Sequence, residues 1–272
     1  MNELPEISSR DNQRLVQARK VRDGHSSGSM FIEGKRLTLE ALRSALDISV
    51  CFVSQRFADS SVNAGMLDQL SVESDYIFEL PDRVFSTIAA TENSQGVILI
   101  AERPGNSVMA IERHLSSEGN LPIVLFMLRA NNPSNLGAIL RTAEASGVAG
   151  VIVSVGSADV FSPKTIRASM GSAFRLPIWS GADFEKVMIW AEKLGLLSTA
   201  IVTDSQVSYS QADFRIPRLL VFGSEAHGIY QGEINRIAES ISIPMENTVE
   251  SLNLGVAAGI ILFEAKRQAD GN

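Results

Sequence analysis

The sequence predicts an α/β protein of two domains, with a mostly parallel sheet in the C-terminal one. Short apolar runs that suit buried strands alternate with amphipathic stretches along almost the whole chain of 272 residues. Such alternation is typical of α/β folds. A polar stretch rich in Gly, Asn and Ser, residues 103–120, interrupts the alternation. The length allows two modest domains, each with its own core.

The pattern in the first half of the chain predicts four strands and several helices. We assign residues 1–105 to an N-terminal domain. In the stretch 9–21, Leu15, Ala18 and Val21 fall near one side of a helix. Pro81 suits the first turn of another helix. The expected strands are 30–34, 48–54, 76–80 and 96–104, and the other expected helices are 36–46 and 61–70.

We place a linker at residues 106–120 and a C-terminal domain at residues 121–272. The strongest strand signal of this domain is PIVLFML (122–128). Strands separated by helices form mostly parallel sheets, so we expect a ligand site beyond the carboxyl ends of these strands. The other expected strands are 150–155, 196–202, 218–223 and 240–244, and the expected helices are 136–145, 184–194 and 252–266.

The composition excludes several kinds of site. Cys51 is the only cysteine, so neither an intrachain disulfide nor a cysteine zinc site is possible. The three histidines lack metal-ligand spacing, and we expect no metal. The N-terminus has no secretory leader, and the apolar run 254–263 is too short to span a bilayer. We therefore expect a cytoplasmic protein without a membrane partner.

The charge pattern requires that any nucleic acid be bound by a local group of Lys and Arg side chains. The formal net charge is −7, but residues 1–50 carry eight Lys/Arg and seven Asp/Glu. Binding of RNA or DNA would then rely on a local cluster of cations rather than on a basic surface overall. A solvated helix face explains these charges equally well. The cations of the first 22 residues are Arg10, Arg14, Arg19, Lys20 and Arg22.

Three familiar motifs fail the test of structural context. GHSSG (24–28) matches the nucleophile elbow G-x-S-x-G, but that elbow needs a strand before its serine, and here a basic helix precedes it. We interpret this segment as a loop. GSMFIEGKR (28–36) departs from a P-loop in its spacing and in its last residue, Arg36. No G-x-G-x-x-G follows an expected strand, which argues against a nucleotide-dependent oxidoreductase.

Two segments of the C-terminal half combine a strand with unusual polar residues. NNPSNLGAILRTAEASG (131–147) follows the first strand, and Ser134 or Asn135 suits the cap of the next helix. LLVFGSEAHGIY (219–230) is a strand that runs into Gly223, where a glycine lets a ligand approach the backbone closely. Taken singly, the first segment is better explained as a capped helix, and the second is equally well explained as a glycine turn.

A third segment, ISIPMENTVESLNLGVAAGIILFEA (241–265), leads a polar loop into a helix with a face of small residues. Ser251 and Asn253 stand at the start of this helix, where exposed backbone amides suit a polar ligand. A capped, buried helix is again the simpler interpretation of this segment by itself.

The order and spacing of the three segments resemble the SpoU/TrmH family of SPOUT RNA 2′-O-ribose methyltransferases. The shared motifs are NxGxxxRTA, a strand followed by GxExxG, and IPM with SLN before a small-residue helix. The connecting segment SPKTIRASMGSAFRLPI (162–178) also looks like that family. RDNQRLVQARKVR, MFIEGKRLTLEAL and TENSQGVILIAERP are similar to its L30e-like substrate-binding domain. The resemblance covers nearly the whole chain.

The resemblance implies a C-terminal domain tied in a deep trefoil knot, an exception to normal chain topology. It implies that S-adenosylmethionine binds in the bends of the knot, largely through backbone groups. It also implies a homodimer formed through the C-terminal domains, with residues of both chains in each active site. The implied donor-binding residues are Gly223, Ile243, Leu252 and Met245.

The reaction that the resemblance implies is transfer of a methyl group from S-adenosylmethionine to a ribose 2′-hydroxyl of RNA. Arg141 is the expected catalytic arginine. Because a guanidinium stays protonated, we expect it to hold the adjacent phosphate and stabilise the developing alkoxide charge. Asn135, Glu225, Ser251 and Asn253 are expected to orient Arg141 or to relay the proton.

The implied RNA partner is ribosomal RNA, usually the 23S RNA of the large subunit. A transfer-RNA 2′-O-methyltransferase and a non-catalytic RNA-binding assembly factor remain the alternatives. Phosphate contacts give affinity without sequence information, so the target nucleotide cannot be inferred from them. The expected RNA-binding residues of the N-terminal domain are Arg10, Arg14, Arg19, Lys20, Lys35 and Arg36.

Overall fold

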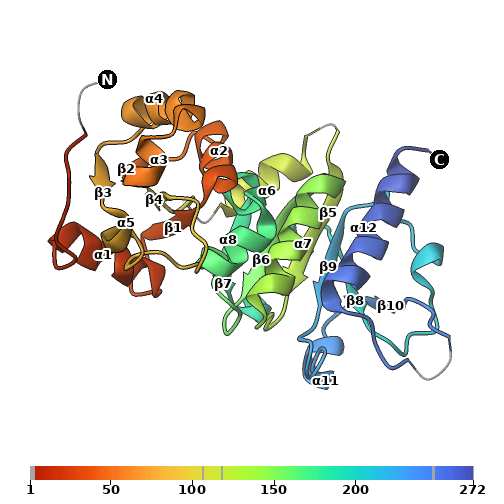
Figure 1. Cartoon of the computed structure of the whole chain (residues 1–272). Coiled ribbons are helices and arrows are strands. Elements are labelled where there is room, and N and C mark those ends of the chain that lie inside the picture. Colours follow the sequence, from red (N-terminus) through yellow and green to blue (C-terminus); the bar gives the residue numbers. More distant parts are fainter. Residues whose placement is uncertain (1–3, 106, 118, 247–248, 272) are drawn as a thin grey trace. The chain divides into compact units, whose positions relative to one another are not determined.

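The computed structural model describes residues 4–105, 107–117, 119–246 and 249–271. Residues 106 and 118 of the expected linker and residues 247–248 of the third motif lie outside this range. The chain forms two compact units (Figure 1). The N-terminal unit comprises Met1–Gly105 and Phe161–Arg175, and the C-terminal unit comprises Asn106–Val160 and Leu176–Asn272.

The N-terminal unit is built on a mixed four-stranded sheet. Strand β4 (Val97–Glu102) pairs antiparallel with β1 (Ser29–Glu33) and β2 (Ile48–Ser54), and β2 pairs parallel with β3 (Ile77–Leu80). The strand order is β1-β4-β2-β3. Helix α1 (Gln13–Arg22) buries the three residues expected on its apolar side, Leu15, Ala18 and Val21. The α/β prediction for this region is confirmed.

The remaining helices of the N-terminal unit include two that were expected elsewhere. The segment Phe161–Arg175 was expected in the C-terminal domain, yet its contacts place it in the N-terminal unit. Helix α8 packs on β1, and Arg175 of α9 bonds Glu40 at 2.7 Å. The helices are α2 (Lys35–Arg43), α3 (Gln55–Ala58), α4 (Ala64–Glu73), α5 (Asp82–Phe85), α8 (Pro163–Ser169) and α9 (Ser172–Arg175), with a 3-10 turn at Ser61–Asn63.

The C-terminal unit contains a six-stranded sheet in which every pairing is parallel, which confirms the predicted parallel sheet. Its order is β10-β8-β9-β5-β6-β7. Strand β9 therefore lies between β5 and β8, and the carboxyl ends of these three strands adjoin. The strands are β5 (Leu121–Met127), β6 (Val148–Ser154), β7 (Ile178–Ala182), β8 (Leu197–Ile201), β9 (Arg218–Phe222) and β10 (Glu239–Ile241).

Helices of the C-terminal unit pack on this sheet and on one another. Helix α6 occupies most of the range that we expected to be a linker, and its Ile111 is fully buried. Helix α12 packs against α7, and a Cβ placed on Gly255 would lie 3.7 Å from that of Ala138. The helices are α6 (Val108–Leu115), α7 (Pro133–Ser146), α10 (Phe184–Lys193), α11 (Gln231–Ile234) and α12 (Leu254–Ala269), with a 3-10 turn at Tyr209–Gln211.

One sequence expectation holds at this level and one needs adjustment. GHSSG forms a loop between α1 and β1, as predicted. Strand β7 was not expected, because its sequence IWSGA is short and carries Ser180 and Gly181 where an apolar run would be usual. Among the described residues, no helix has the length and apolar character that crossing a membrane requires.

Candidate active site at the carboxyl edge of the parallel sheet

A pocket of about 890 Å³ lies where strands β8, β9 and β10 end and helices α7 and α12 begin. This is the position expected for a ligand site in an open parallel sheet. The pocket brings together every residue predicted to bind the methyl donor and four of the five predicted catalytic residues. Lining it are Gly223, Ile243, Met245 and Leu252 of the first group, and Asn135, Glu225, Ser251 and Asn253 of the second.

Hydrogen bonds between side chains connect the three motifs in this pocket. Asn135 Nδ2 donates to Glu225 Oε1 at 2.7 Å. Asn253 Nδ2 donates to Asn135 Oδ1 at 3.2 Å. Asn135 therefore uses both ends of its amide, one toward each of the other motifs. The amide donates with its nitrogen and accepts with its oxygen, whereas a carboxylate at position 135 would have no hydrogen to donate and would face Glu225 with like charge.

Two asparagines cap the helices that enter the pocket. Asn253 Oδ1 accepts from the backbone N–H of Gly255 at 2.9 Å and so begins α12. Asn132 caps α7 by accepting from the N–H of Ser134 at 2.9 Å, with Pro133 in the first helical turn. The prediction that Ser134 or Asn135 caps α7 was therefore wrong. Pro133 suits the first helical position, which puts the cap at the residue before it.

Gly223 ends β9 at a point where no side chain fits. A Cβ at this position would lie 2.2 Å from the carbonyl carbon of Gly228. The loop between them closes on itself, because Ser224 and Gly228 exchange backbone hydrogen bonds of 3.0 and 2.9 Å. Ser224 Oγ also accepts from the N–H of His227 at 3.0 Å. The tight turn holds Glu225 beside Asn135.

A second link between the loops that flank the pocket was not foreseen. Arg129, just after β5, makes two hydrogen bonds of 2.6 and 2.7 Å to the carboxylate of Glu233 in α11. Its guanidinium also lies 4.0 Å from the ring centroid of Tyr230. Arg129 adopts a φ of 50°, which is uncommon for a non-glycine residue and carries strain. A paired, stacked arginine with strained backbone indicates that this junction is held in one arrangement.

The environment of this ion pair favours its charged form. Burial alone would raise the pKa of Glu233, but the hydrogen bonds from Arg129 and from the Tyr230 amide outweigh it, so the pKa lies below the ordinary value of 4.5. The hydrogen bond to Glu233 raises the pKa of Arg129. No signal in the sequence pointed to this pair, because the two residues are 104 positions apart.

Arg141, the fifth predicted catalytic residue, does not line the pocket of its own chain. It is exposed on α7, and it makes no hydrogen bond or ion pair within the part of the chain that the structure describes. Its side chain is thus available to a group outside the described chain. The sequence also left Asn132, Asp204 and His227 out of the site, although all three line the pocket.

The predicted RNA-binding cations lie on the N-terminal unit in varied settings. The Arg14 guanidinium lies 4.3 Å from the ring centroid of Tyr76 and 4.9 Å from that of Phe78. Arg19 donates to the carbonyl of Arg10 at 2.8 Å, which leaves it less available than its neighbours. Exposed on the surface are Arg10, Arg14, Lys20 and Arg36, whereas Lys35 is half-buried.

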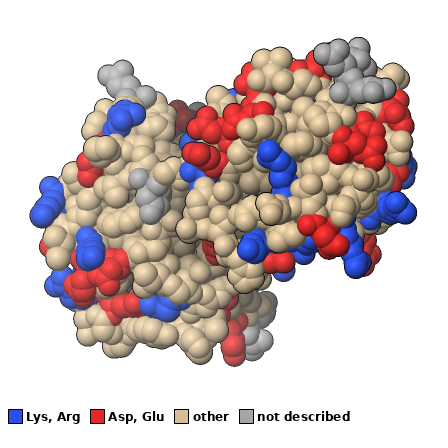
Figure 2. Space-filling model, turned by 90° about the vertical axis from the view of Figure 1, so that its left-hand side faces the viewer, with Lys and Arg blue, Asp and Glu red and all other residues tan. Residues whose placement is uncertain are grey.

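Charge is mixed on the surface that Figure 2 shows. Lys and Arg side chains there are interspersed with Asp and Glu, and the described residues of this face form no continuous basic field.

Among the described residues, no cluster of three or more His, Cys, Asp or Glu could hold a metal ion. Cys51 is buried, and burial raises the pKa of its thiol.

Comparison with known proteins identifies the class. The model of the SpoU rRNA Methylase family matches residues 122–263, and that of the MRM3-like substrate binding domain matches residues 12–99. The 23S rRNA (uridine(2479)-2′-O)-methyltransferase of Streptomyces viridochromogenes is 33% identical over 203 residues, which cover 73% of this chain and 69% of that protein.

Two solved structures show how far the likeness extends. The AdoMet-bound rRNA methyltransferase of Sinorhizobium meliloti is 28% identical, with a TM-score of 0.82 over 97% of this chain and 98% of that one. The TrmH/SpoU tRNA-modifying enzyme of A. aeolicus is 25% identical, with a TM-score of 0.52 over 59% of this chain and 83% of that one.

The fold and the site define an S-adenosylmethionine-dependent RNA 2′-O-methyltransferase. The chain belongs to the SpoU rRNA methylase family, and its N-terminal half carries the substrate-binding domain of the MRM3-like type. The resemblance inferred from the three ordered motifs is confirmed.

The close approach at Gly223 predicts that the substitution Gly223→Ala weakens binding of S-adenosylmethionine. The added Cβ would displace the Gly228 carbonyl and with it the loop that lines the pocket. We expect the affinity measured by calorimetry to fall at least about fivefold, since overpacking of this kind costs about 1–3 kcal/mol. Gly232→Ala is the control, because a Cβ there meets nothing within 4 Å. Equal affinities for the two variants would contradict the steric account.

The lowered pKa of Glu233 predicts how its contribution to stability depends on pH. A carboxylate with a depressed pKa stabilises the fold above its ordinary value of 4.5, and this contribution is lost as the pH falls through the folded-state pKa. The thermal midpoint of the wild type should exceed that of Glu233→Gln at neutral pH, and the gap should close on acidification. Glu185→Gln, which breaks an exposed pair, should show little gap at any pH. A Glu233→Gln gap that stays constant down to about pH 3 would refute the assignment.

Proposed function

We propose that this protein transfers the methyl group of S-adenosylmethionine to a ribose 2′-hydroxyl of large-subunit (23S) ribosomal RNA. The observation that carries the proposal is the hydrogen-bonded series Glu225–Asn135–Asn253, which unites the three motifs around one pocket. The extent of the likeness supports ribosomal RNA over transfer RNA. The rRNA methyltransferase of known structure matches along 97% of this chain, whereas the tRNA-modifying enzyme matches along 59%.

The residues of the pocket fit S-adenosylmethionine. Gly223 lets the loop after β9 fold closely beside the pocket, and the start of α12 adds polar side chains at Ser251 and Asn253. Ile243, Met245 and Leu252 would surround the apolar parts of the donor. When bound, the donor supplies a methyl group on a sulfonium sulfur. The chain's own task is to hold that methyl in line with a ribose oxygen, and such alignment supplies much of the rate increase.

Arg141 is proposed to act on the ribose rather than on the donor. A guanidinium remains protonated, so it would grip the adjacent phosphate and stabilise the charge that develops on the 2′-oxygen. Its exposure outside the pocket of its own chain supports a role across a dimer, where it would reach the pocket of the partner. Asn135 and Glu225 would then orient the ribose or carry away its proton.

The dimer is proposed to form through α7 and α12. Val256 and Phe263 lie seven residues apart on one side of α12 and are 52% and 51% exposed. Apolar side chains in such a stripe suit burial against a second copy. Arg141 lies on α7, the helix that packs against α12. A two-fold interface of this kind would place two active sites on one dimer.

Two finer features of the family are also proposed for this chain. The segment from β10 to α12 would pass through a loop of the C-terminal unit to make a deep trefoil knot. Support comes from the path of the chain, since α12 follows the edge strand β10 yet packs against α7 and contacts the central strand β5. The N-terminal unit would be L30e-like. Because its substrate is part of the ribosome, we place the protein in the cytoplasm.

The proposal predicts that one 2′-O-methyl site of 23S ribosomal RNA disappears when the gene is deleted. Mass-spectrometric mapping should show its return with the wild-type gene and not with Arg141→Ala, because loss of a group that stabilises transition-state charge costs at least about 10²-fold in rate. Arg215→Ala, at an exposed surface pair of the same unit, is the control.

The other outcomes of this map separate the alternatives. Loss of a transfer-RNA site in the deletion strain would establish a tRNA methyltransferase instead. Loss of no methyl group would favour a non-catalytic assembly factor. Donor affinity of Arg141→Ala should equal that of the wild type, and a parallel loss of donor binding would show that the proposed role of Arg141 is wrong.

A mixing experiment tests the composition of the active site. Arg141→Ala keeps its donor pocket, and Gly223→Ala keeps its arginine. At a donor concentration well below the Kd of Gly223→Ala, each should therefore have little activity alone. If Arg141 acts on the partner's pocket, unfolding and refolding the two together should yield heterodimers with one complete site. Random pairing would restore about a quarter of the wild-type sites. The mixture should remain inactive if Arg141 serves its own chain or if the protein is a monomer.

A further inference from the structure

Tyr230 presents an aromatic ring to solvent at the edge of the donor pocket. The two residues before it, Gly228 and Ile229, line that pocket, and so does Ile234 further along the chain. Tyr230 itself does not line the pocket, and it is 49% exposed. Its ring therefore lies beside the pocket rather than in it.

The Tyr230 ring is held in place from one side. The guanidinium of Arg129 lies 4.0 Å from the ring centroid, a distance at which a cation and a ring attract each other. Two hydrogen bonds of 2.6 and 2.7 Å fix Arg129 to the carboxylate of Glu233. The same carboxylate accepts from the backbone N–H of Tyr230 at 3.0 Å. Because the guanidinium covers one face of the ring, the exposed part of the side chain leaves the opposite face open.

Arg129 is not available to an RNA phosphate as a further cation. Its Nη1 and Nη2 both donate to Glu233, whose negative charge neutralises the guanidinium, and both side chains are largely buried. Its Nε is buried and has no hydrogen-bond partner among the described residues, so it does not reach a ligand at the surface. The group that this cluster offers at the surface is therefore the ring of Tyr230, a flat and uncharged apolar face.

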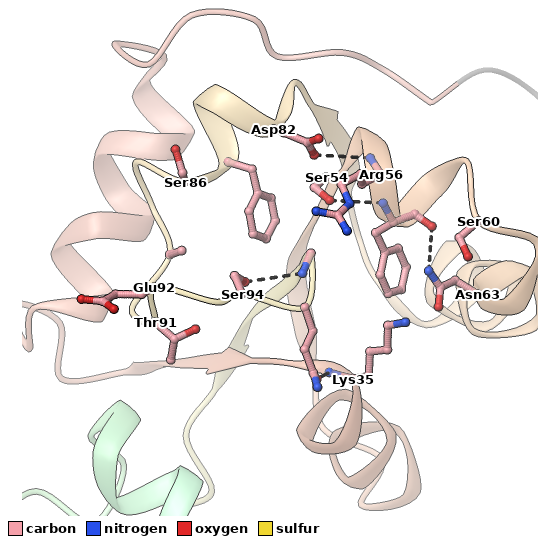
Figure 3. Close-up of a pocket in the computed structure, with 15 residues that line it drawn as sticks. Lys35, Ser54, Arg56, Ser60, Asn63, Asp82, Ser86, Thr91, Glu92 and Ser94 are labelled. Carbon is pink, nitrogen blue, oxygen red and sulfur yellow. Dashed lines mark hydrogen bonds between the residues drawn. The ribbon is translucent and has the colours of Figure 1, made fainter.

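Two other cation–aromatic contacts show what distinguishes Tyr230. In the N-terminal unit, the pocket around Arg56, of about 480 Å³ (Figure 3), holds the Lys35 ammonium 5.5 Å from the ring centroid of Phe57. Phe57 is buried, so its ring has no free face. Tyr76, which also contacts an arginine, is half-exposed, but it belongs to the N-terminal unit, whereas the donor pocket belongs to the C-terminal unit. Tyr230 combines an open face with a place beside the reacting groups.

A fixed aromatic face beside a site that methylates a ribose suits a nucleobase. The acceptor ribose must reach the methyl group in the pocket, so its own base and those of its neighbours come to lie near the pocket edge. Unpaired bases of RNA stack on aromatic side chains, and every base has a face that can do so. A base that leaves its helix loses its stacking, and a protein ring replaces part of that loss. A ring that is already held in place loses little entropy on binding.

We propose that Tyr230 stacks on one unpaired base of the RNA substrate, through the ring face opposite Arg129. That base belongs to the methylated nucleotide or to its immediate neighbour. The contact favours a target ribose in a loop or bulge over one in a continuous duplex, because only an unstacked base can cover the ring. This inference rests on the proposed function, since it assumes an RNA substrate.

The test compares Tyr230→Ala with Tyr230→Phe, each made in the full-length protein. The substrate is 23S ribosomal RNA isolated from cells that lack the gene. We expect Tyr230→Ala to raise the KM for this RNA at least about fivefold, as loss of one base–aromatic stack does. Tyr230→Phe keeps the ring and should stay within about twofold of the wild type. Donor affinity measured by calorimetry should be the same in all three proteins, because Tyr230 does not line the pocket.

Ultraviolet crosslinking of the wild type, to the same RNA and to large ribosomal subunits from the same cells, tests the contact directly. The peptide that contains Tyr230 should carry a nucleotide at or next to the methylated position. A crosslink of this peptide to a ribosomal protein would overturn the inference, because the ring would then be a protein-binding surface.

The kinetic outcomes that would overturn the inference are equally specific. An unchanged KM for Tyr230→Ala would show that no base stacks on the ring, and an equal rise for Tyr230→Phe would assign the effect to the hydroxyl. A parallel loss of donor affinity in Tyr230→Ala would show that the ring only supports the pocket. Failure of the proposed function is distinct, since the wild type itself would then methylate no ribosomal RNA.

Discussion

The amide of Asn135 is the interaction on which the arrangement of the active site depends. It donates to Glu225, which follows β9, and accepts from Asn253, which caps α12. Three segments separated by as many as 118 positions therefore meet at one side chain. The parallel sheet makes the meeting possible, because the insertion of β9 between β5 and β8 brings their carboxyl ends together. The pocket beyond the ends of these strands is the consequence of this junction.

Close packing of small residues supports the same junction. Gly223 allows the loop after β9 to fold against itself, and Gly255 lets α12 approach α7 near Ala138. The pair of Arg129 and Glu233 ties the residues after β5 to α11 on the other flank of the site. A site held from several directions before ligand binding loses little entropy when the donor enters. This rigidity is what in-line transfer requires of the protein.

Much of the C-terminal unit could be predicted from sequence, because buried parallel strands such as PIVLFML are continuous apolar runs. The pocket residues came from motif order, and the structure places them around one cavity. Helix α6 was missed because Gly, Asn and Ser on both sides of it made the stretch 103–120 look like a linker, and Ile111 is its only fully buried residue. The pair of Arg129 and Glu233, and the pocket around Arg56, join distant segments that carry no periodic or motif signal. Such long-range contacts follow from the fold and not from local pattern.

The most direct test of the central claim is a double-mutant cycle on Asn135 and Asn253, with affinity for S-adenosylmethionine measured by calorimetry. If the two amides act as one connected unit, Asn135→Ala and Asn253→Ala should each weaken binding of the donor. The double variant should then bind the donor only slightly more weakly than the single variant with the lower affinity. The coupling should then fall within about 0.5–3 kcal/mol, the range for residues in contact. Losses that add without coupling would show that the motifs shape the pocket independently and would contradict the account.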